Sequence, residues 1–209
     1  MLSASRLSAL TRLFSSAVFR ELAKKGRSPL FRRLLDQADL PGRCATVGEA
    51  FDSAFGTLKV AGLRDEYIYR AALTHKILMG THSLSTASML NEFRAGACRA
   101  DLVILNSTAT AYEIKSERDS LARLANQISN YKRVFAKVNV IASEGHVDAV
   151  LAAVPDDVGI MYLTKRYTIS QVRDAIDRPE RVCQIGMRTG TESLLTRRWR
   201  ELDSNFRFH

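Results

Sequence analysis

Two acidic residues and a lysine have the types and the spacing that metal-dependent hydrolysis needs. Eleven residues separate Asp101 from Glu113, and Lys115 lies two residues after Glu113. Carboxylate oxygens are the ligands that Mg²⁺ and Mn²⁺ prefer. A bound ion activates water and stabilises charge on a phosphate, and a lysine can orient or deprotonate that water. Asp101, Glu113 and Lys115 are therefore candidate catalytic residues, and both acids are candidate metal ligands.

The segment 99–115 is expected to place these residues together as a β-hairpin. Apolar and β-branched residues over 99–105 and 110–115 predict two strands, and the turn chemistry of 106–108 lies between them. If the turn centres on Ser107, Asp101 opposes Glu113, and their Cβ atoms would be about 4.5–5.5 Å apart. Two carboxylates so close repel each other unless a cation lies between them. Lys115 projects from the same face as Glu113.

The following segment, 118–136, has an apolar stripe that predicts an amphipathic helix. It carries Gln127 and Tyr131, which are four residues apart and so share one side of that helix. The preceding segment, 86–93, is expected to be a short helix that carries Glu92.

Taken together, these residues resemble the PD-(D/E)XK nuclease superfamily. Asp101 with Glu113-Ile114-Lys115 is similar to its D…(D/E)-x-K signature, with Ala100 in place of the proline, and Gln127-x-x-x-Tyr131 is similar to the motif of its RecB-like branch. The same motifs with the late Trp199-Arg200 resemble the bacterial sce7726 family. The resemblance implies a restriction-endonuclease-like mixed β-sheet flanked by helices, a Mg²⁺ or Mn²⁺ cofactor, Glu92 as an additional catalytic acid and metal ligand, and a phage, mobile-element or defence setting.

The charge distribution favours a polyanionic partner, with nucleic acid first and an anionic membrane second. DNA is the nucleic acid that we favour. The net charge is +9, and residues 1–43 hold nine Lys or Arg against three acids. Gln127 and Tyr131 are candidates for positioning substrate. The candidate phosphate contacts are Arg94, Arg99, Arg197 and Arg198. The other interpretation of the basic ends is that they are ordinary solvated helix faces.

A second function from another class stays open: a non-catalytic nucleic-acid-binding or regulatory phage protein that keeps the nuclease fold. Three widely spaced cysteines exclude a disulfide framework and a cysteine-built zinc site. No apolar run approaches the roughly 20 residues that span a bilayer, so an integral membrane protein is excluded. The oligomeric state and any protein partner stay open.

Residues 1–20 have two interpretations. They contain three arginines and no acid, which is typical of a mitochondrial transit peptide and also of a basic amphipathic helix packed on the domain. We favour the packed helix and a bacterial cytoplasmic location, with the mitochondrial matrix as the alternative.

The chain as a whole is expected to be α/β. Helices are predicted over 6–24, 28–37, 46–60, 64–79 and 146–153, strands over 138–142 and 158–163, and a mostly helical tail. We therefore expect a basic helical region over 1–80 packed on the core, a nuclease-like core over 81–165 and a basic helical extension over 166–209.

Overall fold

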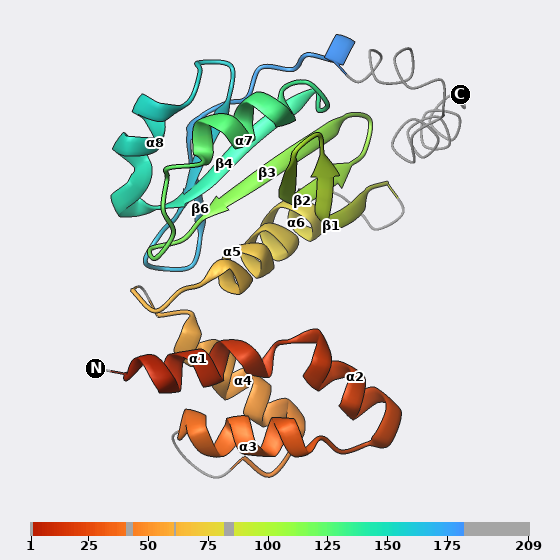
Figure 1. Cartoon of the computed structure of the whole chain (residues 1–209), viewed down its shortest axis with the longest axis vertical. Helices are drawn as coiled ribbons and strands as arrows, with labels where there is room; N and C mark the ends of the chain where they lie inside the picture. The colour runs from red at the N-terminus through yellow and green to blue at the C-terminus, as the bar shows by residue number, and fades with distance from the viewer. Residues whose placement is uncertain (1, 41–43, 61, 82–85, 182–209) are drawn as a thin grey trace. The chain divides into compact units, whose positions relative to one another are not determined.

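A computed structural model describes residues 2–40, 44–60, 62–81 and 86–181 of the chain (Figure 1). Its contacts divide the chain into two units, Met1–Ile68 and Tyr69–His209. The expected boundary near residue 80 therefore differs from the structure by about one helix, α5, which begins at the end of the first unit. The expectation that the N-terminal region packs on the core stays a prediction.

The first unit is helical. Its helices are α1 (Ala4–Leu13), α2 (Ser16–Lys25), α3 (Pro29–Ala38) and α4 (Val47–Leu58). Three of them begin at a hydroxyl N-cap, because Ser3, Ser28 and Thr46 each accept a hydrogen bond from a backbone N–H three residues later. Leu10 and Leu13 of α1 are fully buried. These first residues thus form part of a packed core, as the favoured interpretation of residues 1–20 expected.

The predicted helix over 6–24 is two helices, so that prediction was wrong at its centre. α1 ends at Phe14, and Ser15 is the N-cap position of α2. The Phe14 ring stacks on Tyr67 with centroids 4.4 Å apart and lies 5.4 Å from Phe51. The apolar periodicity continued across this break because the aromatic side chain stays in the core while the backbone turns.

The second unit is built on a six-stranded sheet in the order β1-β2-β3-β4-β5-β6. The strands are β1 (Ser88–Ala95), β2 (Cys98–Leu105), β3 (Ala109–Lys115), β4 (Lys137–Ser143), β5 (Gly159–Leu163) and β6 (Ile169–Arg173). β3, β4 and β5 are parallel, and the other neighbours are antiparallel. This is the mixed sheet with flanking helices that the sequence predicted.

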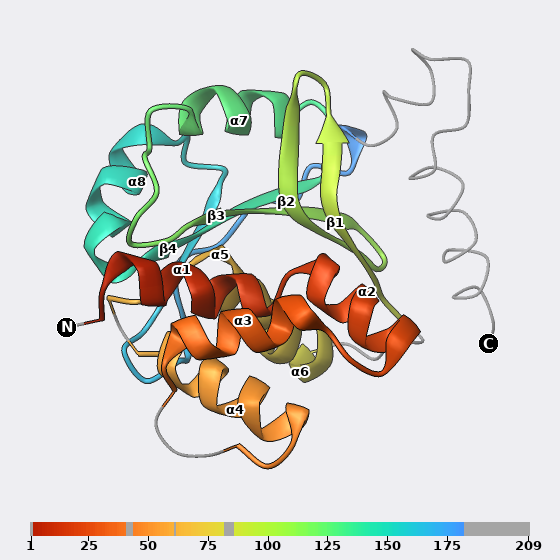
Figure 2. The ribbon, with the colours of Figure 1, turned by 60° about the horizontal axis from the view of Figure 1, so that its bottom comes forward.

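Helices cover the sheet on both sides. α7 (Leu124–Tyr131) and α8 (Val147–Ala153) are the crossovers of the parallel pairs and lie over one face, as Figures 1 and 2 show. On the opposite side run the Tyr69–Leu73 part of α5 (Glu66–Leu73), a π-helical turn (Thr74–Leu78) and α6 (Met79–Thr81). A short 3₁₀ turn (Glu144–His146) precedes α8. All seven residues of β3 are buried, so the central strand has helices or neighbouring strands on every side.

The expected helix over 86–93 is wrong, because residues 88–93 belong to β1. Gly96, at φ +62°, lies in the turn that joins β1 to β2, and Ala95 pairs with Cys98 across it. The antiparallel partner supplied by β2 outweighs the local helix signal. Glu92 is therefore a strand residue.

Two further predictions need correction. The helix over 118–136 is regular only across α7, although Leu121 and Phe135 beyond its ends still pack on the apolar cluster beneath it. In the tail, Ile169–Arg173 forms β6 and pairs with β5, so the sheet extends past residue 165. Among the described residues, no helix is both long and apolar enough to cross a membrane.

Candidate active site

The β2–β3 hairpin has the register that the sequence predicted. Leu102 pairs with Tyr112 and Val103 with Ala111, as a turn centred on Ser107 requires. Asp101 directly precedes Leu102 on β2, and its Oδ2 accepts a hydrogen bond of 2.8 Å from the backbone N–H of Ile114. The Asp101 carboxylate thus lies beside β3 at the residue between Glu113 and Lys115.

Glu113 and Lys115 form a buried ion pair on β3. Lys115 Nζ donates to Glu113 Oε1 over 2.8 Å, and the two side chains are 7% and 1% exposed, respectively. The residues between and around them on the strand are apolar or small. Burying two charges costs several kcal/mol per ion unless further hydrogen bonds satisfy them.

α7 supplies those further hydrogen bonds. Gln127 accepts from Lys115 Nζ over 3.0 Å with Oε1 and donates to Glu113 Oε1 over 2.5 Å with Nε2. The Tyr131 hydroxyl lies 2.7 Å from Glu113 Oε2. Both oxygens of Glu113 therefore have protein partners, and the orientation of the Gln127 amide is fixed by having a donor on one side and an acceptor on the other.

Tyr131 also ties this network to β2. Its hydroxyl lies 2.6 Å from the backbone carbonyl of Arg99, so one proton serves two nearby acceptors. Burial and the adjacent Glu113 carboxylate raise the pKa of Tyr131 far above its usual value, so the phenol stays neutral. The residue is 0% exposed. This placement makes Tyr131 a positioning residue for Glu113, whereas the sequence suggested contact with substrate.

Glu92 lies opposite Asp101 on β1. The paired residues Asn91↔Leu102 and Phe93↔Ala100 flank the two acids, and Glu92 has φ +55°, a left-handed conformation that non-glycine residues rarely adopt. Its carboxylate forms ion pairs with Arg70 at 3.2 Å and Arg99 at 3.1 Å.

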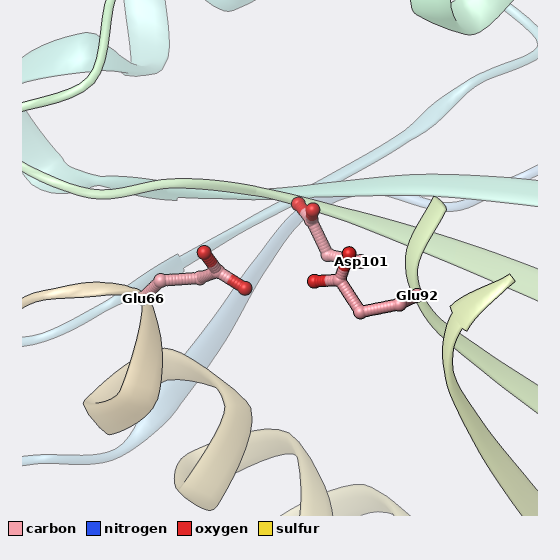
Figure 3. Close-up of side chains that lie close together, drawn as sticks. All are labelled: Glu66, Glu92 and Asp101. Carbon is pink, nitrogen blue, oxygen red and sulfur yellow. The ribbon is translucent and has the colours of Figure 1, made fainter. Parts of the chain in front are cut away.

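Two acids of neighbouring strands lie close together, as Figure 3 shows. Glu92 and Asp101 each offer one carboxylate oxygen within 4.8 Å of the other. Two ligands of one cation, each 2.0–2.6 Å from it, lie at most about 5 Å apart, so this spacing is compatible with a shared Mg²⁺ or Mn²⁺. Glu92 and Asp101, which both lie in the second unit, are called the acidic group from here on.

The structure therefore divides the predicted site residues into two groups. Asp101 and Glu92 lie in the acidic group, and Glu113 lies in the adjoining network with Lys115, Gln127 and Tyr131.

Two of the four arginines predicted to contact phosphate lie within the described residues. Arg94 and Arg99 are exposed and face each other across the β1–β2 pair. Arg197 and Arg198 lie outside the described residues.

Comparisons with known proteins point to a phage setting. The family model described as "Bacteriophage P4 protein cII" matches residues 59–195. Protein cII of Enterobacteria phage P4 is 37% identical over 102 residues, which are 48% of this chain and 38% of that protein. The chain thus spans about two fifths of this relative's length.

A solved structure also has a partial likeness: the SPO1766 protein of unknown function from Silicibacter pomeroyi, with 18% identity and a TM-score of 0.37. That match covers 60% of this chain and 85% of the other, and a TM-score so low carries no argument. The matched proteins bear neither the name of the PD-(D/E)XK superfamily nor that of the sce7726 family, so those resemblances stay predictions. The phage setting that the sequence suggested is supported.

Proposed function

We propose that this chain, which belongs to the family of bacteriophage P4 protein cII, is a metal-dependent nuclease that hydrolyses phosphodiester bonds, with DNA as the favoured substrate. The observation that carries the proposal is the buried Glu113–Lys115 pair, held by Gln127 and Tyr131 beside the carboxylates of Asp101 and Glu92.

The energetic cost of this arrangement supports a functional role. A buried ion pair is often no more stable than apolar residues of the same volume, and Glu113 and Lys115 are the only charged residues of the fully buried β3. An ion pair retained at the centre of a sheet, with acids grouped next to it, is typical of a site where charge is needed for chemistry.

Each residue of the site would have a distinct role in the proposed reaction. Asp101 and Glu92 would hold Mg²⁺ or Mn²⁺, with Glu113 within the same hairpin as a further carboxylate. Such an ion supplies Lewis-acid stabilisation of the phosphate and lowers the pKa of water. Lys115, fixed by Glu113 and Gln127, provides the positive charge that orients the attacking water and offsets negative charge at the phosphate. The exposed Arg94 and Arg99 would contact the nucleic-acid backbone.

A second function has its own support: a non-catalytic nucleic-acid-binding or regulatory phage protein that keeps this fold. The family match supports the phage setting of this second function. In addition, both oxygens of Glu113 already have protein donors, as they would in a purely structural network. The net charge of +9 supports nucleic-acid binding under either function.

A paired assay separates the two functions. Nicking of supercoiled plasmid is measured with Mg²⁺, with Mn²⁺ and with EDTA, and DNA binding is measured in EDTA, for the wild type and for Asp101→Asn. A nuclease cuts only with metal and loses cutting, but not binding, in the variant. A wild type that binds DNA and leaves every DNA and RNA form intact with both metals establishes the non-catalytic function instead.

A further inference from the structure

The first unit contains a pocket lined by basic side chains. Its volume is about 660 Å³, and it lies between the end of α2, the start of α3 and the start of α4. Lys25, Arg27 and Arg32 contribute the charge, and Leu22, Phe31 and Val47 contribute apolar walls. The pocket lies outside residues 59–195, the part that matches the phage family.

The cations of this pocket have no direct carboxylate partner among the described residues. No acidic side chain is among the lining residues that the structure describes. The nearest acids along the chain hydrogen-bond to two other lining residues and not to these cations: Glu21 accepts from Ser28 Oγ, and Glu49 accepts from the backbone N–H of Ala45. Within the described part of the first unit, no ion pair joins Lys25, Arg27 or Arg32 to a carboxylate. Three cations gathered around one concavity repel one another, and an anion in the pocket relieves that repulsion.

The backbone holds the three cations around the concavity. Gly26 ends α2 in the left-handed conformation at φ +65°, where a side chain would be strained. The chain therefore reverses between Lys25 and Arg27 and enters α3, whose N-cap is Ser28. The positive ends of the α3 and α4 dipoles add to the potential of the side chains.

We propose that this pocket binds the phosphates of a nucleic-acid backbone. Its cations are exposed, so a continuous strand can reach them, and its volume accommodates more than one phosphate. The inference rests on the nucleic-acid partner of the proposed function, but it does not require cleavage. The pocket anchors the strand, whereas Asp101, Glu113 and Lys115 belong to a separate site in the other unit.

The test compares two double variants of the full chain with equal changes in charge. Lys25→Glu/Arg32→Glu reverses two cations of the pocket, and Lys24→Glu/Arg33→Glu reverses their exposed neighbours on the same helices, which do not line it. Binding to fluorescent single-stranded and duplex DNA is titrated in EDTA at several salt concentrations. Circular dichroism checks that both variants fold, and the neutral pair Lys25→Gln/Arg32→Gln replaces the first if it does not.

We expect the pocket variant to lose about tenfold or more in affinity and the salt dependence of its log K to fall by about 2, one unit for each lost phosphate contact. The neighbour variant should lose much less. Equal losses in both variants, or no loss in the pocket variant, overturn the inference, as does a wild type that binds no DNA. The nuclease proposal is tested separately, by the metal assay on the wild type and Asp101→Asn, so its failure is distinguished from failure of this inference.

Cys44 offers a direct measure of occupancy, because its thiol is part of the pocket lining and is partly exposed. DNA should slow alkylation of Cys44 by iodoacetamide in the wild type and in the neighbour variant Lys24→Glu/Arg33→Glu, and not in the pocket variant. Unchanged alkylation of Cys44 at saturating DNA contradicts binding in this pocket.

Discussion

Removing Lys115 alone should destabilise the fold far more than removing both charges of its ion pair. In Lys115→Met, Glu113 keeps its negative charge at 1% exposure and loses the one cation that pairs with it among the described residues. Breaking a buried pair in this way typically costs about 3–5 kcal/mol. Adding Glu113→Gln removes the remaining charge while an amide still meets Gln127 and Tyr131, so the double variant should recover most of that loss.

Urea denaturation followed by circular dichroism measures this difference. With a denaturant dependence of about 2 kcal/mol per molar, the single variant should unfold at a urea concentration lower by roughly 2 M. Lys137→Met is the matched control, since its partner Asp177 is 44% exposed and a surface ion pair contributes only about 0–1 kcal/mol. If Lys115→Met is no less stable than Lys137→Met, the argument from burial is refuted.

The same variants separate stability from function. If the nuclease proposal is correct, the double variant is stable and inactive, because neither the lysine nor the carboxylate remains at the site. Recovery of stability together with cleavage would mean that the ion pair has no role in the chemistry.

Three further outcomes are expected. Tyr131→Phe should lower the free energy of unfolding by about 1.5–3 kcal/mol, the usual value of a hydrogen bond to a charged group, as measured by urea denaturation. Burial raises the pKa of Asp157, but hydrogen bonds from Lys132 and Arg181 outweigh it and hold the pKa below 3.8. Its stabilising contribution is therefore present above pH 3.8 and is lost as the pH falls through the lowered pKa, so Asp157→Asn should flatten the melting temperature against pH in that range alone. Mn²⁺ should raise the melting temperature of the wild type and of Asp157→Asn but not that of Asp101→Asn; equal shifts in all three would place the ion elsewhere.

The hairpin that carries the site could be predicted from the sequence because its determinants are local. Turn residues at 106–108 and the apolar run before them fix the register of β2 on β3, and the structure has that register. The four-residue spacing of Gln127 and Tyr131 likewise predicted that both would face one side of α7, and both reach Glu113.

What could not be predicted depends on partners distant in the chain. Glu92 lies in a strand because β2 is available to pair with it, and its helix signal was too weak to compete. The role of Tyr131 depends on the Arg99 carbonyl, 32 residues away, which no local pattern reveals.

The left-handed backbone at Glu92 has a consequence for anyone who redesigns this protein. A non-glycine residue in this conformation lowers the stability of the fold by about 1 kcal/mol or more. The two half-exposed ion pairs of Glu92 stabilise it by about the same amount at most. Selection for thermal stability alone has little reason to keep this glutamate, and glycine or asparagine would relieve the backbone. A thermostabilised version obtained in that way would lose a carboxylate of the acidic group while its melting curve improved. Position 92 should therefore be held fixed in any stability screen of this chain.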